Sequence, residues 1–512
     1  MTNATAMEKT FRLFRLYDEQ HIICGAPIRY KNAYYEALLL LTEKAYEVSV
    51  ISEYEAFFTA YKNLWSITEC GNMRMKNTFA HLNKIDKKRH SGFFGFIKKP
   101  IYARKYLYAL IIEAAYILSL ANKLNFTELI SEVEQFCKVP ENIKNWLQEY
   151  FSLLFAKDIQ THSLIDYVQN ANIKYMADTV KHITEHLLEI KAYEALPVFN
   201  ISVIATMSAG KSTFVNALLG NEIFPEANEA CTAKITSIYD NDFYHRIIGV
   251  GLHNGEIKEV SNNLRNEDLI KWNTNKTFDR IILEGDLDNI TNTEKIVAVH
   301  DTPGTNNSGD TNHHDITFEF LQKHTMDAVI YMANVEHLAT TDEKELLTEL
   351  YNTIISIKNI PVIFVLNKSD SIDTEKENIF DMCKIFKDEL ISIGFTPDSF
   401  IIPTSAKAAR LFKMALNNKA DTFTGKEKKD FMSAYELLSD NSIITPILNH
   451  DMQQHKVNDE TITIAQQSFS KQNIVRALYN TGFPNLEAIL EAVAVNDNTQ
   501  LTNYKNILGG IK

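Results

Sequence analysis

Long hydrophobic runs are scarce in this sequence of 512 residues. The longest apolar stretch, Tyr106–Ala121, contains Glu113 and is shorter than the about 20 residues that a membrane-spanning helix needs. We interpret it as a buried core helix, with a membrane span as the alternative. The N-terminus, MTNATAMEKTFRLFRLYDEQ, carries charges where a signal peptide needs an apolar core.

Close cysteine pairs and an excess of positive charge are also missing. The five cysteines are scattered, which is typical of free thiols in a reducing compartment. The net charge is −13, whereas a broad nucleic-acid-binding face needs clustered cations. We therefore expect a cytoplasmic protein that binds no nucleic acid. Peripheral attachment to the inner face of the membrane is an alternative location.

The pattern of the sequence changes near Pro197. Before it, long helical segments contain few Gly or Pro, and after it short β-branched runs alternate with helical patterns. We predict an all-α domain over residues 1–192, with bundle or stalk character. An α/β domain with a mainly parallel sheet, flanking helices and C-terminal closing helices follows over residues 193–512.

An apolar seam marks the last helix before this change. Its members, at alternating spacings of three and four residues, are Ile173, Met176, Val180, Ile183, Leu187 and Ile190. The seam predicts one continuous helix over residues 163–191, leading into the first strand of the next domain. Such a helix either passes motion between domains or serves only as a bundle helix.

Six short apolar runs after Pro197 predict strands. They cover residues 199–205, 235–239, 296–300, 328–333, 362–367 and 400–403. Helical patterns follow all of them except the second. Right-handed crossovers would make these strands mainly parallel. The charged stretch GKEKKD, residues 425–430, is interpreted as a solvated loop.

The loop Ala205–Ser212 has the residue order that holds a phosphate chain. Gly210 lets backbone N–H groups turn toward phosphate, and the next helix offers its positive end. Lys211 can reach the β- and γ-phosphates, and Ser212 can coordinate Mg²⁺. Ala205 stands where Gly is usual, and we expect it to be tolerated if its φ is negative.

Two later segments fit the rest of a phosphate-hydrolysing site. Thr232, in EACTAKITSIY, is a candidate switch residue that can complete Mg²⁺ coordination and hold the attacking water. In IVAVHDTPG, Asp301 ends an apolar strand and can hold Mg²⁺ through water. The N–H group of Gly304 can donate to the γ-phosphate. The DTPG turn alone also fits an ordinary tight turn.

The segment PVIFVLNKSD predicts recognition of guanine. Asp370 can accept hydrogen bonds from the N1–H and 2-amino groups of guanine, which adenine cannot match. In IIPTSAKAA, backbone N–H groups and the Lys407 stem can support the base. The predicted nucleotide-binding residues are Met207, Ser208, Ala209, Gly210, Lys211, Ser212, Thr213, Asp301, Gly304, Asn367, Lys368, Asp370, Ser405, Ala406 and Lys407.

These segments make the sequence similar to the dynamin superfamily, specifically its bacterial dynamin-like proteins, over about residues 197–495. The matches are TMSAGKST, NEACTAKI, DTPG and NKSD, with looser ones at HLATTDEKELL and TGFPNLEAIL. The long link between Thr232 and Asp301 is also typical of dynamin-like domains. The resemblance implies an α/β P-loop GTPase domain that hydrolyses GTP to GDP and phosphate with Mg²⁺.

The resemblance also implies individual roles. Lys211, Ser212, Thr232 and Asp301 would hold the nucleotide and Mg²⁺, with Ser212, Thr232 and Asp301 as the metal set. Ser208 would help place a charge-compensating cation, which completes a catalytic set of Lys211, Thr232 and Ser208. Met207 replaces the water-orienting Gln of classical dynamins. Hydrolysis would then rely on Thr232 or a partner residue, which predicts slow turnover.

Partners follow from the resemblance and from one basic segment. Dynamin-like proteins are stimulated when two GTPase domains meet, which implies a homodimer or assembly with a second dynamin-like chain. The short remainder after TGFPNLEAIL leaves any stalk to the N-terminal helices or to a partner. An apolar tip flanked by cations could enter an anionic membrane. Its residues are Phe93, Phe94, Phe96, Lys98 and Lys99.

The sequence leaves the biological role open. The same phenylalanines also fit a helix–helix connection that docks on the core. We expect a self-association-stimulated GTPase that remodels membranes. The alternatives are a soluble GTP-switched protein-binding module and a weakly active structural partner of another dynamin-like subunit.

Overall fold

The chain forms two compact units in this computed structural model, Met1–Ala195 and Leu196–Lys512. The structure describes residues 11–16, 20–46, 51–67, 85–86, 101–102, 104–135, 138–156, 161–171, 177–206, 208–225, 234–292, 294–304, 312–338, 340–372, 377–440 and 460–509. Pro197, where the sequence pattern changes, lies two residues beyond the division between the units.

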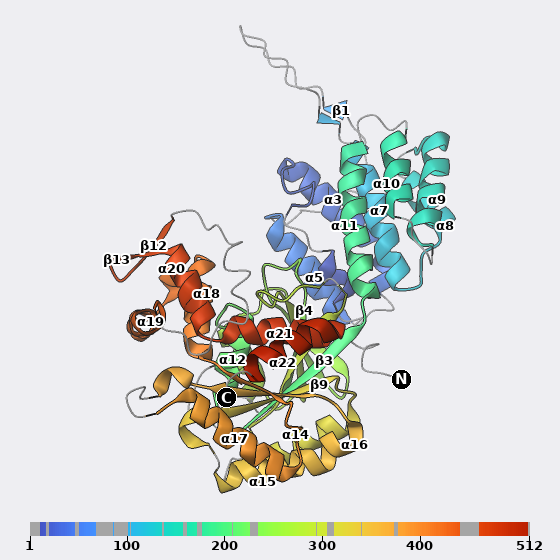
Figure 1. The fold of residues 1–512 in the computed structure, drawn as a ribbon. Coiled ribbons are helices and arrows are strands. Elements are labelled where there is room, and N and C mark those ends of the chain that lie inside the picture. Colours follow the sequence, from blue (N-terminus) through green and yellow to red (C-terminus); the bar gives the residue numbers. More distant parts are fainter. Residues whose placement is uncertain are drawn as a thin grey trace. The chain divides into compact units, whose positions relative to one another are not determined.

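The described part of the first unit is helical apart from one short strand pair (Figure 1). Its helices are α2 (Arg12–Arg15), α3 (Ile28–Leu41), α4 (Glu43–Tyr46), α5 (Ile51–Leu64), α7 (Arg104–Leu120), α8 (Phe126–Glu134), α9 (Glu141–Leu154), α10 (Thr161–Asn170) and α11 (Ala177–Ala195). Strands β1 (Ile85–Asp86) and β2 (Ile101–Tyr102) pair antiparallel.

Helix α7 is the helix predicted from the longest apolar stretch. Every side chain from Tyr106 to Leu118 is buried, including that of Glu113. The Glu113 carboxylate accepts hydrogen bonds from the hydroxyls of Tyr34 and Tyr61, at 2.5 Å and 2.7 Å. Among the described residues, no helix has both the length and the apolar character needed to cross a membrane. The stretch is therefore a core helix of this unit.

The prediction of one continuous helix over residues 163–191 is wrong. Helix α10 ends at Asn170, α11 begins at Ala177, and the two helices pack against each other. Asn170 ends α10, and asparagine side chains compete for backbone hydrogen bonds and favour turns. In α11 the seam is buried at Val180 and at every later member, whereas Ile173 and Met176 lie outside the described residues.

The second unit is built on a nine-stranded sheet with the order β11-β10-β9-β3-β8-β4-β7-β5-β6. Its strands are β3 (Val198–Ala205), β4 (Ile235–Asp240), β5 (Ile248–His253), β6 (Glu256–Ser261), β7 (Arg280–Gly285), β8 (Ile296–Asp301), β9 (Ala328–Asn334), β10 (Val362–Asn367) and β11 (Phe400–Pro403). A separate hairpin pairs β12 (Thr461–Ile464) with β13 (Gln467–Ser470).

The sheet is mainly parallel, as predicted, but β4 runs against the expected direction. Strands β11, β10, β9, β3 and β8 are parallel neighbours. Strand β4 is antiparallel to β8, with Thr236 opposite Asp301. Strands β5, β6 and β7, which were not predicted, extend the sheet beyond β4. The long link between Thr232 and Asp301 therefore contains four strands of the sheet.

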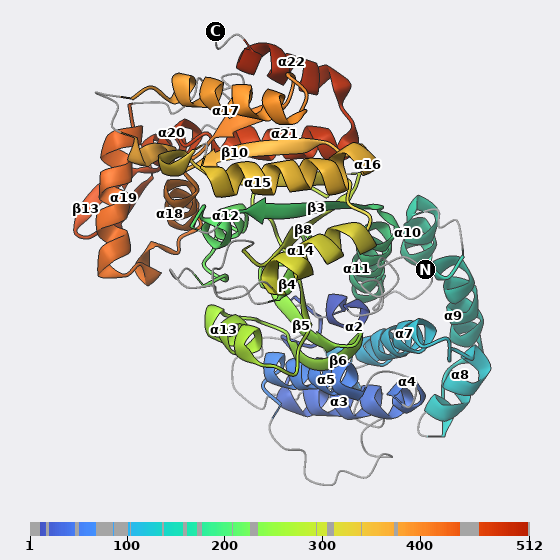
Figure 2. The same ribbon diagram turned by 90° about the horizontal axis from the view of Figure 1, so that it is seen from below.

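Helices cover both faces of this sheet (Figures 1 and 2). The described helices of this unit are α12 (Lys211–Leu218), α13 (Asn266–Thr274), α14 (Asn312–Lys323), α15 (Thr341–Leu350), α16 (Ser356–Lys358), α17 (Ile379–Ile393), α18 (Ala406–Leu416), α19 (Gly425–Leu438), α20 (Lys471–Asn480), α21 (Phe483–Val495) and α22 (Asn498–Gly509). Short turns of other helix types occur at Val335–His337, Tyr351–Ile355, Ser369–Ser371 and Ala420–Thr422.

Two helix starts show how local sequence sets these bounds. Thr340 caps α15, since its hydroxyl accepts from the Glu343 N–H at 3.3 Å. The stretch GKEKKD is not a loop but the first turns of α19. There the Thr424 hydroxyl and the Glu427 carboxylate cap each other's backbone N–H groups. This reciprocal capping box explains why such a polar stretch starts a helix.

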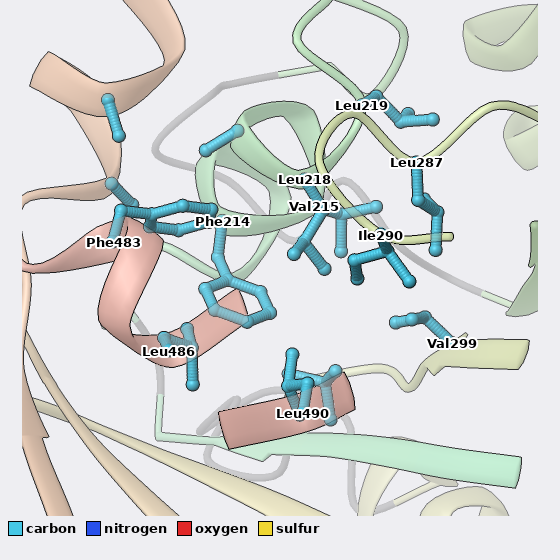
Figure 3. Close-up of a cluster of buried hydrophobic side chains, with 14 of the residues drawn as sticks. Phe214, Val215, Leu218, Leu219, Leu287, Ile290, Val299, Phe483, Leu486 and Leu490 are labelled. Atoms are coloured by element: carbon cyan, nitrogen blue, oxygen red, sulfur yellow. The ribbon is translucent and has the colours of Figure 1, made fainter. Parts of the chain in front are cut away.

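The P-loop helix is held by packing on one face of the sheet. Alternate residues of β3 point to opposite faces, so Ile201 and Val203 join one hydrophobic cluster and Ile204 the other. On the first face, α12 packs against α21 (Figure 3). The rings of Phe214 and Phe483 lie 5.5 Å apart, measured between centroids. This contact fixes the helix that begins at the phosphate-binding loop.

Candidate functional site

The predicted nucleotide segments meet at one edge of the sheet. Because β3, β8, β10 and β11 are parallel, their carboxyl ends lie at the same edge. The P-loop follows β3, Asp301 ends β8, Asn367 ends β10, and Ser405 follows β11. Ala205, the residue in place of Gly, is the last residue of β3 and pairs with Met332 of β9. Its extended backbone carries an alanine without strain.

Gly210 occupies a position in the phosphate loop that only glycine fits. Its φ is +89°, and an added Cβ would lie 2.5 Å from the Asn367 Nδ2 atom. The Gly210 carbonyl accepts the Phe214 N–H at 2.9 Å, which starts α12. Ser208 is exposed and also has a positive φ, of 62°. The loop therefore has the left-handed turns that point backbone N–H groups at an anion.

Asn367 joins the phosphate loop to the base-recognition segments. Its side-chain amide donates to the Ala209 carbonyl at 2.8 Å and accepts the Ala406 N–H at 3.0 Å. Asn367 and Ala209 are buried, as is Ala406. The sequence predicts Asn367 as part of the site but does not reveal this bridge, because it joins three segments far apart in the chain.

Lys211 lies beside Asp301 at the start of α12. Burial lowers the pKa of Lys211, and the negative charge of Asp301 acts in the opposite direction. The Asp301 carboxylate is almost fully buried. Ser212 and Thr213 are half-buried in the first turn of α12. A half-buried cation and a buried carboxylate beside a helix N-terminus form a pre-arranged site for a phosphate group with a metal ion.

The donor set fits Mg²⁺. A serine hydroxyl and a carboxylate are hard oxygen ligands, and Mg²⁺ binds through one or two such groups together with phosphates and water. The turn after Asp301 is held in place, since the Thr302 hydroxyl donates to the Val203 carbonyl at 2.8 Å. The Thr317 hydroxyl donates to the Pro303 carbonyl at 3.2 Å. Gly304 follows, half-buried, at the end of this turn.

The base-recognition segments are held together by backbone bonds. The Ser369 N–H donates to the Thr404 carbonyl at 3.0 Å, and the Thr404 N–H donates to the Leu366 carbonyl at 2.8 Å. Lys368 has a left-handed φ of 65°, a conformation that concentrates at ligand sites. Asp370 follows in a short helical turn and is half-buried. Asp370 therefore lies three residues after Asn367, at the same edge of the sheet.

Ser405 and Lys407 complete this side of the site. The buried Ser405 hydroxyl accepts the Ala408 N–H at 3.3 Å and caps α18. The exposed Lys407 ammonium lies 2.7 Å from a carboxylate oxygen of Asp430 on α19. This ion pair, which the sequence did not predict, holds the lysine stem toward α19.

Some predicted residues lie outside the part of the chain that the structure describes. They are Met207, Thr232, Phe93, Phe94, Phe96, Lys98 and Lys99. The roles assigned to them from the sequence therefore stay predictions.

Comparisons with known proteins bear on the same segments. Residues 201–369 match the sequence family described as the Dynamin family. An uncharacterized protein from the xynA 3′ region of Caldicellulosiruptor sp. (strain Rt8B.4) is 26% identical over 263 residues. That alignment covers 51% of this chain and 59% of the relative.

Solved structures with similar folds are more distant in sequence. One bacterial dynamin pair, described as sensing and tethering membranes, matches with 17% identity and a TM-score of 0.33. The match covers 93% of this chain and 75% of that one. Toc33 from Arabidopsis thaliana, in complex with GDP and Mg²⁺, matches with 12% identity and a TM-score of 0.28, covering 64% and 95%.

The family match spans the P-loop, the Asp301 turn and the first part of the guanine segment, which are also the segments that the sheet brings to one edge. The similarity to the Dynamin family therefore lies within the second unit and covers these segments.

Proposed function

We propose that this chain binds GTP with Mg²⁺ and hydrolyses it to GDP and phosphate. The observation that carries the proposal is the Asn367 side chain, which bonds to both the phosphate loop and the Ala406 backbone. This bridge sets the spacing between phosphate and base recognition. A dinucleotide or a simple phosphate ester needs no such link between these two segments.

Catalysis of phosphoryl transfer depends mainly on positioning and on electrostatic stabilisation of the negatively charged phosphates. The roles of the residues follow from these two requirements. Lys211 and the loop N–H groups hold the phosphate chain, and the Asp370 carboxylate selects guanine. Ser212 and Asp301 would hold Mg²⁺, which when bound neutralises charge on the β- and γ-phosphates. Thr232 is assigned to the attacking water by the family resemblance.

Turnover of GTP by the purified chain tests this proposal. We expect phosphate release that stops when Mg²⁺ is chelated. Ser212→Ala should lower turnover at least about tenfold at limiting Mg²⁺ through loss of a metal ligand. The control is Ser356→Ala, an exposed serine on α16, which should match the wild type. Turnover that persists without divalent metal, or that prefers ATP, contradicts the proposal.

Self-association and membrane action are the finer part of the proposal. The match of residues 201–369 to the Dynamin family and the basic, phenylalanine-rich segment from Lys84 to Lys105 support a GTPase that is stimulated by pairing and acts at an anionic membrane surface. The partner is a second copy or another dynamin-like chain. A soluble GTP-switched protein-binding module is the alternative.

Specific activity measured against protein concentration, with and without anionic liposomes, separates these possibilities. A rise with concentration supports pairing. A further rise with liposomes that is lost in Lys98→Glu/Lys99→Glu supports membrane action. An activity that liposomes leave unchanged at every concentration rules out the membrane role and favours a protein partner.

A further inference from the structure

Lys234 makes an unusual set of contacts at the nucleotide edge of the sheet. It immediately precedes β4 and is buried, with 9% of its surface exposed. Its ammonium group donates to the carbonyls of Trp272, Asn273 and Asn275, at 2.7 Å, 2.6 Å and 2.8 Å. These carbonyls lie at the C-terminal end of α13. Lys234 thus ties the start of β4 to a helix of the inserted segment.

Every donor of the Lys234 ammonium group has an acceptor in this contact. A lysine ammonium has three donors, and here all three reach carbonyls in the last turn of α13 or just after it, where the helix no longer supplies N–H partners to its own carbonyls. The negative end of the helix dipole also favours a cation at this point. A contact of this kind holds one backbone segment firmly against another.

The position of the contact is what relates it to the nucleotide. In the pairing of β4 with β8, Thr236 lies opposite Asp301. The chain therefore enters β4 beside the carboxylate that we assign to the metal. In the sequence, Lys234 comes two residues after Thr232. An anchor at Lys234 therefore fixes the start of the strand that pairs with Asp301.

A second lysine provides a natural comparison. The Lys358 ammonium donates to the carbonyls of Leu321, Gln322 and His324 at the C-terminal end of α14. This end of α14 leads into β9, at the amino end of the parallel strands. It therefore lies at the edge of the sheet opposite the nucleotide segments. Lys234 and Lys358 share the same chemistry but lie at opposite edges of the sheet.

We propose that Lys234 is a positioning residue for GTP hydrolysis, which anchors the start of β4 against α13 and so positions the strand that pairs with Asp301 for the metal-dependent step. The inference rests on the proposed function. Lys358, by contrast, serves only to cap a helix. Removing either ammonium group should lower stability, but only the loss of Lys234 should alter turnover and the response to Mg²⁺.

The test compares Lys234→Met with Lys358→Met in the full chain. Thermal stability, Kd for GDP, kcat for GTP and the Mg²⁺ concentration giving half-maximal turnover are measured for each. We expect Lys234→Met to lower kcat roughly tenfold or more and to raise the Mg²⁺ requirement by a similar factor, because small displacements of reacting groups are costly. The Kd for GDP should change less than about threefold, and kcat of Lys358→Met less than about twofold.

Lys234→Arg extends the test if Lys234→Met folds poorly. Arginine keeps the positive charge but not the compact three-way geometry, so its kcat should lie between those of wild type and Lys234→Met. Equal values of kcat and of the Mg²⁺ requirement in Lys234→Met and Lys358→Met would overturn the inference. A wild-type kcat in Lys234→Arg, together with a wild-type Mg²⁺ requirement in Lys234→Met, would also overturn it. A wild type that binds and hydrolyses no GTP overturns the proposed function itself, whereas an active wild type matched by Lys234→Met overturns only the inference.

Discussion

Both units bury glutamate side chains, and two of them, Glu113 and Glu487, are held in opposite ways. In the helical unit, Glu113 accepts from two tyrosine hydroxyls and lies 3.4 Å from the His21 Nε2 atom. In the α/β unit, Glu487 pairs with the buried Lys413 ammonium and accepts from the Asn289 amide at 3.3 Å. Both side chains are almost fully removed from water.

The pKa values of these carboxyls differ as a result. Burial acts to raise the pKa of Glu113, but His21 and the tyrosine hydroxyls outweigh it, and the pKa is lowered. Burial raises the pKa of Glu487 to about 7 against the opposing effect of Lys413. Two hydroxyl donors and an imidazole therefore hold the charge on Glu113 better than one buried cation holds it on Glu487.

The difference fits what each unit does. Glu113 joins helices α3, α5 and α7 into one core, and its partners all belong to that core. Glu487 lies on α21, and its partners come from α18 and from the loop after β7. Lys413 also donates to the Asp288 carbonyl of that loop at 3.0 Å. The helical unit uses its buried charge for stability, whereas the α/β unit uses it to join elements around the P-loop helix.

The largest expected effect is confined to the nucleotide edge. Lys211→Ala should weaken GTP binding by roughly a thousandfold, about 4 kcal/mol, because it removes the cation that we assign to the phosphates. Amide hydrogen exchange should show the helical unit unchanged in the same variant. Calorimetric titration measures the affinity, and retained GTP binding would overturn the site assignment.

In the helical unit, the corresponding change should affect stability alone. Glu113→Ala leaves His21 and two tyrosine hydroxyls without their shared acceptor, which should cost about 3 kcal/mol. Hydrogen exchange in α7 reports this loss, and GTP affinity should stay at the wild-type value. The control is Glu189→Ala, at an exposed site on α11. A loss of GTP affinity in Glu113→Ala would contradict the division of roles.

Alanine substitutions at two glycines distinguish the effect of backbone strain from the effect of a clash with Asn367. Gly210 and Gly255 have similar φ angles of +89° and +79°, but an alanine Cβ at Gly255 would meet nothing within 4 Å. Both substitutions should cost about 1 kcal/mol of stability through the positive φ. Only Gly210→Ala should also lower GTP affinity, by about tenfold, through its clash with Asn367. Equal affinities for the two variants would show that the Asn367 contact does not matter.

The smallest effect is a pH dependence. Because the folded-state pKa of Glu487 is raised to about 7, the folded protein keeps a proton that the unfolded chain releases near pH 4.5. Stability of the α/β unit should therefore fall as pH rises between these values, by on the order of 1 kcal/mol from this group. Glu487→Gln should flatten that slope, and Glu491→Gln on the same helix should keep it.

Glu113 predicts the opposite slope in the helical unit. Its lowered pKa means that its stabilising effect is present above the unfolded value and is lost as pH falls through the folded value. Unfolding followed by hydrogen exchange in each unit, from acidic to neutral pH, compares the two slopes directly. Slopes of the same sign in both units would show that other groups dominate.

The strand ends of the nucleotide site could be predicted from the sequence because each motif directly follows an apolar run. Strands β5 and β6 were missed, although Asn254-Gly255 between them is a strong hairpin signal. The antiparallel direction of β4 could not be predicted from the sequence, because it depends on which strand lies next to β4 in the sheet. The contacts of Asn367 and Lys234 join residues far apart in the chain, and no local pattern encodes them.

The most direct test of the guanine site is binding of GTP, ATP and xanthosine triphosphate to the wild type and to Asp370→Asn. The wild type should prefer GTP to either competitor by at least about a hundredfold, because only guanine donates two hydrogen bonds to the Asp370 carboxylate. Asp370→Asn should reverse the preference toward xanthosine triphosphate, whose 2-oxo group accepts from the asparagine amide. A wild type that binds ATP as tightly as GTP, or a variant with unchanged preference, would contradict the account.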